Sequence, residues 1–229
     1  MMDYHFQMKP LGVLFDLDGT LVDSAPDLVA AVNALRLSRG LPVLPLEQLR
    51  PYASLGARGL LGAGLGVAPD DADFGELQTE FLDYYASHTC VHSQLFDGVE
   101  ELLTLLEVHA IPWGVVTNKH MRFTNSLVHA LGLGQRAAVV VSGDTTAQAK
   151  PHPLPLLYAA EQMGLPADRL VYVGDDRRDI QSARAAGYMT AIAAAYGYCE
   201  GEVVSTWLSD GVAHSPIELL RLFQSTVNA

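Results

Sequence analysis

The sequence has few cysteines, few basic residues and no long apolar run. Cys90 and Cys199 are the only cysteines among 229 residues and lie far apart, so neither a disulfide framework nor a paired-cysteine zinc site is expected. Lys and Arg number 14 against 26 Asp and Glu, a formal net charge of -12, which argues against a nucleic-acid partner. No apolar run reaches about 18 residues, so neither a membrane span nor a membrane partner is expected.

The beginning of the chain lacks the basic segment followed by an apolar segment that marks a secretory signal. We therefore expect a soluble, cytoplasmic protein. Apolar residues make up 49% of the chain, and 229 residues suffice for one large core or for a core with a smaller inserted domain. The sequence makes no prediction of the oligomeric state, which stays unknown.

One stretch, residues 12–21, joins an apolar run to two carboxylates. The run before Asp16 is typical of a strand buried on both faces of a parallel sheet, and Gly19 breaks it. If the chain stays extended through Asp18, its carboxylate and that of Asp16 face one pocket. Two such charges need a shared proton or a cation, and Mg²⁺ suits oxygen ligands. The alternative is an Asp-Gly turn in which Asp16 caps a helix.

The next segment, residues 24–94, has helical patterns and no convincing strand. Ser24 is a candidate N-cap, and Pro26 and Asp27 suit a first helical turn. We therefore predict an all-helical insertion. Its further helical patterns cover residues 46–52, 56–66 and 73–87.

From Asp97 onward, strand and helix patterns alternate, which predicts an α/β fold with a doubly wound parallel sheet. The predicted core domain comprises residues 1–23 and 95–229, and residues 24–94 form a helical cap domain. The predicted strands are 113–117, 138–141, 170–173 and 190–194, and the predicted helices are 99–108, 120–131, 154–163, 179–186 and 217–223.

Polar residues follow three further predicted strands. Because the carboxyl ends of parallel strands share one edge, we expect these residues to meet Asp16 and Asp18 at one crevice. The residues are Thr117 and Asn118 after the second strand, Lys150 after the third, and Asp175, Asp176 and Asp179 after the fourth.

Each of these fragments also has a plainer interpretation. Thr117 could simply end a strand, Lys150 could be a solvated loop charge, and residues 174–176 could form a turn with a helix cap. Their coincidence at one sheet edge favours a functional site.

Together the four motifs resemble those of the haloacid dehalogenase superfamily, in its phosphatase branch. They are Asp16 to Thr20, Thr117-Asn118, Lys150-Pro151, and Gly174-Asp175 with Asp179. The resemblance spans nearly the whole chain and implies a Rossmann-like core with a helical cap between the first two motifs. Within the superfamily, the chain is similar to the phosphoglycolate phosphatase group and to bacterial N-acetylmuramic acid 6-phosphate phosphatases. Residues 54–58, 113–119, 122–123, 174–180 and 196–198 carry this closer likeness.

The resemblance implies a phosphatase that acts on a small phosphorylated metabolite, an acid or acidic sugar. Asp16 would be the nucleophile that forms an aspartyl-phosphate, and Asp18 the general acid and then the base. Mg²⁺ would bind Asp16, Asp175 and the backbone carbonyl of Asp18. The phosphate oxygens would be held by Thr117, Asn118 and Lys150.

Three further residues have two interpretations each. Asp179 would orient either Lys150 or a metal-bound water. Asp176 would contact the metal through water or cap the helix that starts near Arg178. Arg58 would reach from the cap to the substrate, or be a solvent-facing helix charge.

Other activities stay open. A phosphomutase would use the same motifs and pass the phosphoryl group from Asp16 to a second sugar hydroxyl. A catalytically silent binding module could also have this fold. A dehalogenase is disfavoured, because carbon-halogen displacement needs no acid at Asp18. Both phosphoglycolate and N-acetylmuramic acid 6-phosphate stay candidate substrates, because the motifs handle the phosphate that they share.

Overall fold

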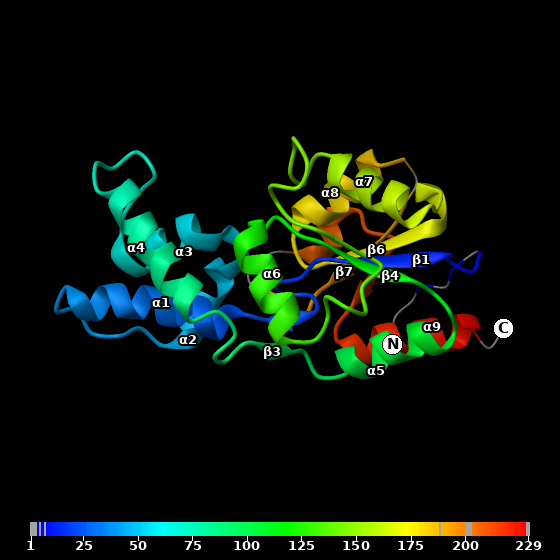
Figure 1. Ribbon diagram of the computed structural model, residues 1–229, viewed down its shortest axis with the longest axis horizontal. Coiled ribbons are helices and arrows are strands. Elements are labelled where there is room, and N and C mark those ends of the chain that lie inside the picture. The colour runs from blue at the N-terminus through cyan, green and yellow to red at the C-terminus, as the bar shows by residue number, and fades with distance from the viewer. Residues whose placement is uncertain (1–3, 5, 7, 188, 200–202, 228–229) are drawn as a thin grey trace.

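A computed structural model describes residues 4, 6, 8–187, 189–199 and 203–227. It has a six-stranded parallel sheet with helices on both faces and a group of helices at one end (Figure 1). This confirms the predicted α/β class and its parallel sheet. The strand order is β5-β4-β1-β6-β7-β8, with bounds β1 Gly12–Phe15, β4 Trp113–Val116, β5 Val139–Val141, β6 Leu170–Gly174, β7 Thr190–Ala194 and β8 Gly211–Ala213.

Strand β1 lies in the middle of the sheet, between β4 and β6. Its Val13, Leu14 and Phe15 are completely buried, because helices cover both faces. Val13 and Phe15 face a core formed with helices α5 (Val99–Val108), α6 (Met121–Ala130) and α9 (Pro216–Val227). Leu14 faces a second core formed with α7 (Leu154–Met163) and α8 (Arg177–Ala185). Burial of a side chain such as Phe15 stabilises the fold by roughly 1.5–3 kcal/mol.

The helices beside the sheet agree closely with the predicted segments. α5 and α7 have the predicted bounds, and α8 begins two residues earlier than predicted because Asp176 caps it. The bounds are α5 Val99–Val108, α6 Met121–Ala130, α7 Leu154–Met163, α8 Arg177–Ala185 and α9 Pro216–Val227, with short 3₁₀ helices η2 Ala167–Arg169 and η3 Val204–Trp207.

The separate group of helices packs around its own apolar cluster, which includes Leu28, Leu60 and Phe81. Phe123 and Tyr198, from the sheet part, also belong to this cluster. We propose that residues 24–94 form a cap domain and call them the cap. Its elements are α1 Ala25–Ser38, α2 Leu46–Leu49, η1 Arg50–Leu55, α3 Gly56–Leu65 and α4 Phe74–Ser87, so the single helix predicted over 46–52 is an α-helix followed by a 3₁₀ helix.

Two very short strands join the cap to the sheet part, and the sequence did not predict them. β2, Val22–Asp23, pairs antiparallel with β3, Gln94–Leu95, so the outgoing and returning chains lie side by side. A strand of two residues is too short to show the alternation of apolar and polar residues from which strands are predicted. The edge strand β8 was missed because its sequence, Gly-Val-Ala, has one β-branched residue, whereas the equally short β5 is Val-Val-Val and was predicted.

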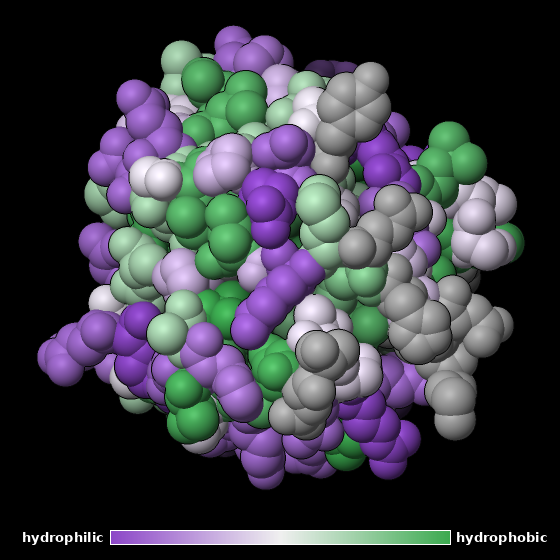
Figure 2. Space-filling model, turned by 90° about the vertical axis from the view of Figure 1, so that its right-hand side faces the viewer, coloured by the Kyte–Doolittle hydropathy of each residue, from purple (hydrophilic) through white to green (hydrophobic). Residues whose placement is uncertain are grey.

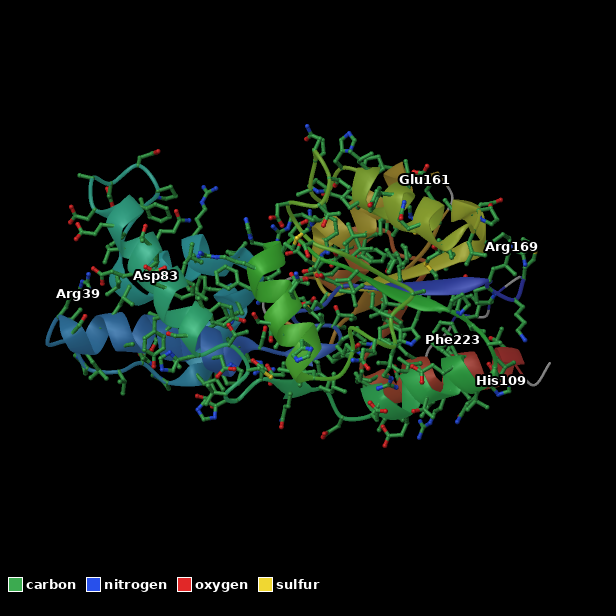
Figure 3. The ribbon with its side chains drawn as sticks, viewed as in Figure 1. Arg39, Asp83, His109, Glu161, Arg169 and Phe223 are labelled. Atoms are coloured by element: carbon green, nitrogen blue, oxygen red, sulfur yellow. The ribbon has the colours of Figure 1, made fainter. Side chains whose placement is uncertain are left out.

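The strands point with their carboxyl ends toward the cap. Arg169, which directly precedes β6, lies at the end of the molecule far from α1 and α4, whereas Arg39 and Asp83 lie in the cap (Figure 3). Figure 2 views the end opposite the cap, where hydrophilic and hydrophobic side chains are interspersed. Among the described residues, no helix is both long and apolar enough to cross a membrane.

Candidate active site

Asp16 directly follows β1, and its carboxylate is held in a buried position. Its Oδ1 lies 3.0 Å from Lys150 Nζ and accepts a hydrogen bond of 2.8 Å from the Leu17 N–H. Burial raises the pKa of Asp16 to about 7, with a further rise from Asp179, although Lys150 opposes both effects. A carboxylate with this pKa, beside a lysine and at the end of a central strand, fits a reactive group.

Asp18 reaches the same cavity as Asp16 by a different geometry from the predicted one. The strand ends at Phe15, and the chain turns, with Gly19 at φ +81° and the Val22 N–H bonded to the Leu17 carbonyl. The extended chain through Asp18, which was one of two possibilities predicted from the sequence, is therefore not formed. A tight turn, instead of strand alternation, gives both aspartates access to one cavity.

The Asp18 carboxylate contacts two polar side chains that the sequence had not linked to it. Its Oδ1 accepts hydrogen bonds from Lys119 Nζ at 3.0 Å and from Ser24 Oγ. Ser24 occupies the predicted N-cap position of α1 but makes no side-chain capping bond there. Its hydroxyl instead holds Asp18.

Lys150 forms the centre of a buried polar network. Its Nζ lies 3.0 Å from Asp16 Oδ1, 2.7 Å from Asp179 Oδ1 and 2.7 Å from the Tyr172 hydroxyl. Burial lowers the pKa of Lys150, but the charges of Asp16 and Asp179 outweigh burial and raise it overall. Lys150 therefore stays charged between two carboxylates, and Asp179 orients it.

Asp175 is almost fully buried and, contrary to expectation, is not in the lining of the cavity. One carboxylate oxygen accepts from Thr20 Oγ at 3.0 Å, and the other from the Tyr198 N–H at 2.8 Å. The backbones of Gly19 and Gly197 pass so close that a Cβ at either position would overlap Asp175. Burial, followed by the charges of Asp16 and Asp179, raises the pKa of Asp175 well above its usual range.

The carboxylates of Asp16, Asp175 and Asp179 form the acidic cluster. Each offers an oxygen, and these oxygens lie within 4.8 Å of one another. Both Asp179 oxygens accept, Oδ1 from Lys150 and Oδ2 from the Asp176 N–H, whereas Lys150 and the Leu17 N–H both bind Oδ1 of Asp16, so Asp16 is better placed than Asp179 to bind a cation. Burial, together with the negative charge of the neighbouring carboxylates, raises the pKa of Asp16 and of Asp175. This donor set fits a hard divalent metal ion. The Asp18 carboxylate is outside the cluster.

Thr117 and Asn118 follow β4 as predicted. Both were expected to hold phosphate oxygens, but the two side chains make different contacts within the protein. Thr117 is buried at the cavity wall, and its Oγ accepts from the Lys119 N–H at 3.1 Å. The Asn118 side chain forms two 2.9 Å hydrogen bonds, one to the Lys150 carbonyl and one from the Lys150 N–H. Asn118 therefore fixes the loop that carries Lys150.

Asp176 caps helix α8. Its Oδ1 accepts from the Arg178 N–H at 2.8 Å, and Asp179 accepts from the Asp176 N–H at 3.0 Å, which makes a reciprocal capping box. Burial raises the pKa of Asp176, but the bonds from Arg178 outweigh it and lower it overall. Arg178 also donates to the Ser54 carbonyl of the cap at 2.8 Å.

A cavity of about 500 Å³ lies between the cap and the carboxyl ends of the strands. Asp16, Asp18, Lys150 and Asp179 line its polar side, and Thr117 and Asn118 are also in its wall. Arg58 does not line it, although its neighbours Gly56 and Ala57 do. The apolar lining consists of Leu28, Ala53, Leu55, Ala57, Phe81, Leu82, Tyr85 and Phe123.

Sequence reasoning gave no separate role to Lys119. Its Nζ contacts Asp18 and also lies 2.8 Å from the Tyr85 hydroxyl of the cap. Burial lowers the pKa of Lys119, but the charges of Asp18 and Tyr85 and the hydrogen bonds to both together outweigh burial and raise the pKa overall, so the side chain is cationic. The position of Lys119 directly after Asn118 was an available signal, whereas the contribution of Tyr85 depends on how the cap packs.

Comparison with known proteins agrees with this geometry. The model of the haloacid dehalogenase-like hydrolase family matches residues 13–193. The chain is 48% identical over 211 residues to the phosphoglycolate phosphatase of Xanthomonas campestris, covering 92% of this chain and 95% of that protein. It is 41% identical over 215 residues to the N-acetylmuramic acid 6-phosphate phosphatase of Pseudomonas aeruginosa, covering 93% and 95%. A crystal structure described as a predicted phosphoglycolate phosphatase from Haemophilus somnus has a TM-score of 0.82 at 26% identity, covering 95% and 99%.

Proposed function

Because the chain belongs to the haloacid dehalogenase-like hydrolase family and is a phosphatase of its phosphoglycolate phosphatase-like group, we propose that it hydrolyses an acidic sugar phosphate, N-acetylmuramic acid 6-phosphate. The observation that carries this choice is the cavity of about 500 Å³ with one polar and one apolar side. Pockets of this size suit ligands much larger than the two-carbon acid phosphoglycolate.

The apolar lining supports the same choice. Leu28, Phe81 and Leu82 come from the cap, and Phe123 from α6. The acetamido and lactyl methyl groups of the sugar can pack on such a wall, and each buried methyl or methylene contributes about 0.8 kcal/mol. Phosphoglycolate has no group that would use this wall.

We propose that Asp16 attacks phosphorus and forms an aspartyl-phosphate, which water then hydrolyses. The Leu17 N–H and Lys150 hold its carboxylate in one orientation. The P–O bond to the sugar breaks as the Asp16 oxygen bonds to phosphorus, and the sugar oxygen takes a proton. Hydrolysis restores the Asp16 carboxylate and releases inorganic phosphate.

Asp18 would supply that proton and later accept one from the attacking water. Ser24 and Lys119 both bind its Oδ1, which fixes the side chain and leaves Oδ2 to face the leaving oxygen. Thr117 and the charged Lys150 would hold the phosphate oxygens, where such donors stabilise the charge of the transition state.

Asp16 and Asp175 would hold Mg²⁺ together with the backbone carbonyl of Asp18. When bound, the ion reduces the repulsion between the nucleophile and the phosphate.

A cytoplasmic location stays a prediction of the sequence.

Phosphoglycolate hydrolysis is the second candidate, favoured by the 48% identity to a protein of that name. The test is a comparison of kcat/KM for the two compounds, measured by release of inorganic phosphate. We expect N-acetylmuramic acid 6-phosphate to be preferred by at least about tenfold, which corresponds to ~1.4 kcal/mol. A preference for phosphoglycolate would reject the proposed substrate. Phosphoryl transfer to a second sugar without phosphate release would indicate the phosphomutase instead.

A further inference from the structure

We propose that Arg122, at the start of α6, forms a second anion subsite that binds the carboxylate of the substrate. The inference rests on the proposed function, because it concerns the same cavity. Arg122 lines that cavity together with Lys119, Lys150 and Arg178. The subsite would take a carboxylate on a phosphomonoester whose phosphate lies at Lys150.

The other three cations of the cavity are already paired with carboxylates. Lys119 lies 3.0 Å from Asp18, Lys150 lies 3.0 Å from Asp16, and Arg178 lies 2.7 Å from Asp176. No ion pair within the described part of the chain involves Arg122. The cavity therefore holds one cation whose charge is not already neutralised by the protein.

A neighbouring acid, Asp144, is committed elsewhere. It accepts from the Met121 N–H at 2.7 Å and lies 3.0 Å from His120 Nε2. Its two oxygens are thus turned toward the first residues of α6. This leaves the Arg122 guanidinium available to an anion in the cavity.

Arg122 is an exposed residue, and its guanidinium stacks on an aromatic side chain of the cavity wall. Its central carbon lies 4.3 Å from the centre of the Phe123 ring, and Phe123 is itself buried and lines the cavity. Stacking on an aromatic ring restricts a guanidinium and leaves its edge free to donate. An arginine edge matches the two oxygens of a carboxylate, so the fixed side chain is suited to bidentate binding.

A chain of contacts relates Arg122 to the reacting end of the cavity. Asp18 contacts Lys119, Lys119 contacts Tyr85, and the Tyr85 ring lies 5.3 Å from that of Phe123, on which Arg122 stacks. The side chains of Lys119, Tyr85 and Phe123 thus connect Asp18 with Arg122. The subsite favours substrates that carry a carboxylate in addition to the phosphate, such as an acidic sugar phosphate.

The test compares two sugar phosphates that differ by the acidic arm. N-acetylmuramic acid 6-phosphate carries a lactyl ether with a carboxylate, and N-acetylglucosamine 6-phosphate lacks it. For Arg122→Met, we expect kcat/KM for the first compound to fall about 10- to 100-fold, mostly through KM, because a hydrogen bond to a charged group is lost. For the second compound we expect a change of less than about threefold. Arg122→Lys should restore part of the loss.

Arg221→Met, an exposed position on α9, makes the same charge change and is the matched control. It should affect neither substrate. An equal loss for both sugars in Arg122→Met would overturn the subsite, as would a selective loss in Arg58→Met with none in Arg122→Met. Thermal unfolding of each variant separates these results from misfolding.

A binding measurement makes the test independent of turnover. In an Asp16→Asn background, calorimetry should show a Kd for N-acetylmuramic acid 6-phosphate that Arg122→Met raises by the same factor. If the unaltered protein hydrolyses neither sugar, the proposed substrate fails, and phosphoglycolate against 2-hydroxyethyl phosphate becomes the test pair. A selective loss on phosphoglycolate would then support the subsite, and an equal loss on both would reject it.

Discussion

The ammonium group of Lys119 lies 2.8 Å from the hydroxyl of Tyr85, so a side chain of the sheet part bonds directly to the cap across the cavity. The same ammonium group binds Asp18 at 3.0 Å. A single side chain therefore joins the proposed proton donor to the wall that would cover the substrate.

Replacing Lys119 should affect turnover more than replacing Tyr85. Lys119→Met removes the charged one of the two side chains that hold Asp18 and leaves Ser24, and we expect kcat to fall about 10- to 100-fold, the scale of a lost charge-assisted hydrogen bond. Tyr85→Phe keeps the Lys119–Asp18 pair and removes only the cap contact, so it should cost less than about tenfold. Steady-state kinetics on one phosphomonoester measures both. A larger loss for Tyr85→Phe would contradict this assignment.

Asp16→Asn should abolish phosphate release, by at least about 1000-fold in kcat, because an amide cannot form the proposed acyl-phosphate. The substitution keeps the side-chain volume, so the folded structure should persist. Asp176→Ala is the comparison variant, since Asp176 caps α8: it should lower the free energy of unfolding by about 1 kcal/mol and still release phosphate at a measurable rate. Retained turnover in Asp16→Asn would reject Asp16 as nucleophile.

Stability of the metal-free protein should fall as pH rises. Asp16 has a pKa of about 7 in the folded protein, whereas the unfolded chain has a pKa of about 4. The unfolded chain therefore loses its proton first, and the free energy of unfolding should decrease from about pH 4 to about pH 7. The raised pKa of Asp175 acts in the same direction.

Mg²⁺ should oppose this loss. Thermal unfolding should show a larger increase in Tm on adding Mg²⁺ at pH 8 than at pH 5, since protons compete with the metal at the lower pH. In Asp175→Asn, the increase in Tm that Mg²⁺ causes at pH 8 should be much smaller. An increase in Tm that is equal at both pH values, or that is unchanged in Asp175→Asn, would count against this metal site.

Gly19→Ala should inactivate and destabilise the protein. Gly19 has φ +81°, and a Cβ there would overlap the Asp175 carboxylate. We expect a loss of more than about 2 kcal/mol in the free energy of unfolding, together with loss of activity. Gly132→Ala is the matched control, because Gly132 has φ +70° and nothing within 4 Å of the added carbon. It should cost only about 1 kcal/mol and retain activity.

Asp27→Ala should destabilise the connection between cap and sheet. The buried Asp27 carboxylate accepts from the His92 N–H at 2.9 Å and from Ser93 N–H and Oγ at 2.9 and 2.6 Å. Removing it leaves a buried donor unsatisfied, with an expected cost of about 1–3 kcal/mol in denaturant unfolding. Asp83→Ala, at an exposed position, should change stability by less than about 0.5 kcal/mol. Equal effects would refute this role.

The sequence predicted the parts of the fold that depend on local pattern. Apolar runs identified β1 and β4, and helical spacing gave α5 and α7 with their bounds. Because parallel strands end at one edge, the motifs also predicted that Asp16, Asp18 and Lys150 would line one cavity, whereas Asp175, expected there too, is not in the lining. The strands β2 and β3 were missed, since two residues carry no periodicity.

Contacts between the cap and the sheet part could not be predicted in the same way. Arg58 was expected to reach the substrate, yet Arg122 and Arg178 line the cavity and Arg58 does not. Which cap side chain faces the cavity depends on how α3 and α4 pack, and one residue of helix rotation changes that face by about 100°. The role of Ser24 was likewise hidden, because its capping pattern does not reveal the bond to Asp18.

The pairing of β2 with β3 also limits how the two parts of the molecule can move. Val22 lies opposite Leu95, and Asp23 opposite Gln94, so both covalent crossings share one ladder. Because the two connecting segments are paired with each other, they form a single hinge, about which the cap would move as one rigid body. Any such swing that widens the cavity mouth would have to separate the Lys119 ammonium from the Tyr85 hydroxyl. The bond from Lys119 to Asp18 lies within the sheet part and would persist, so product could escape without disturbing the proposed proton donor.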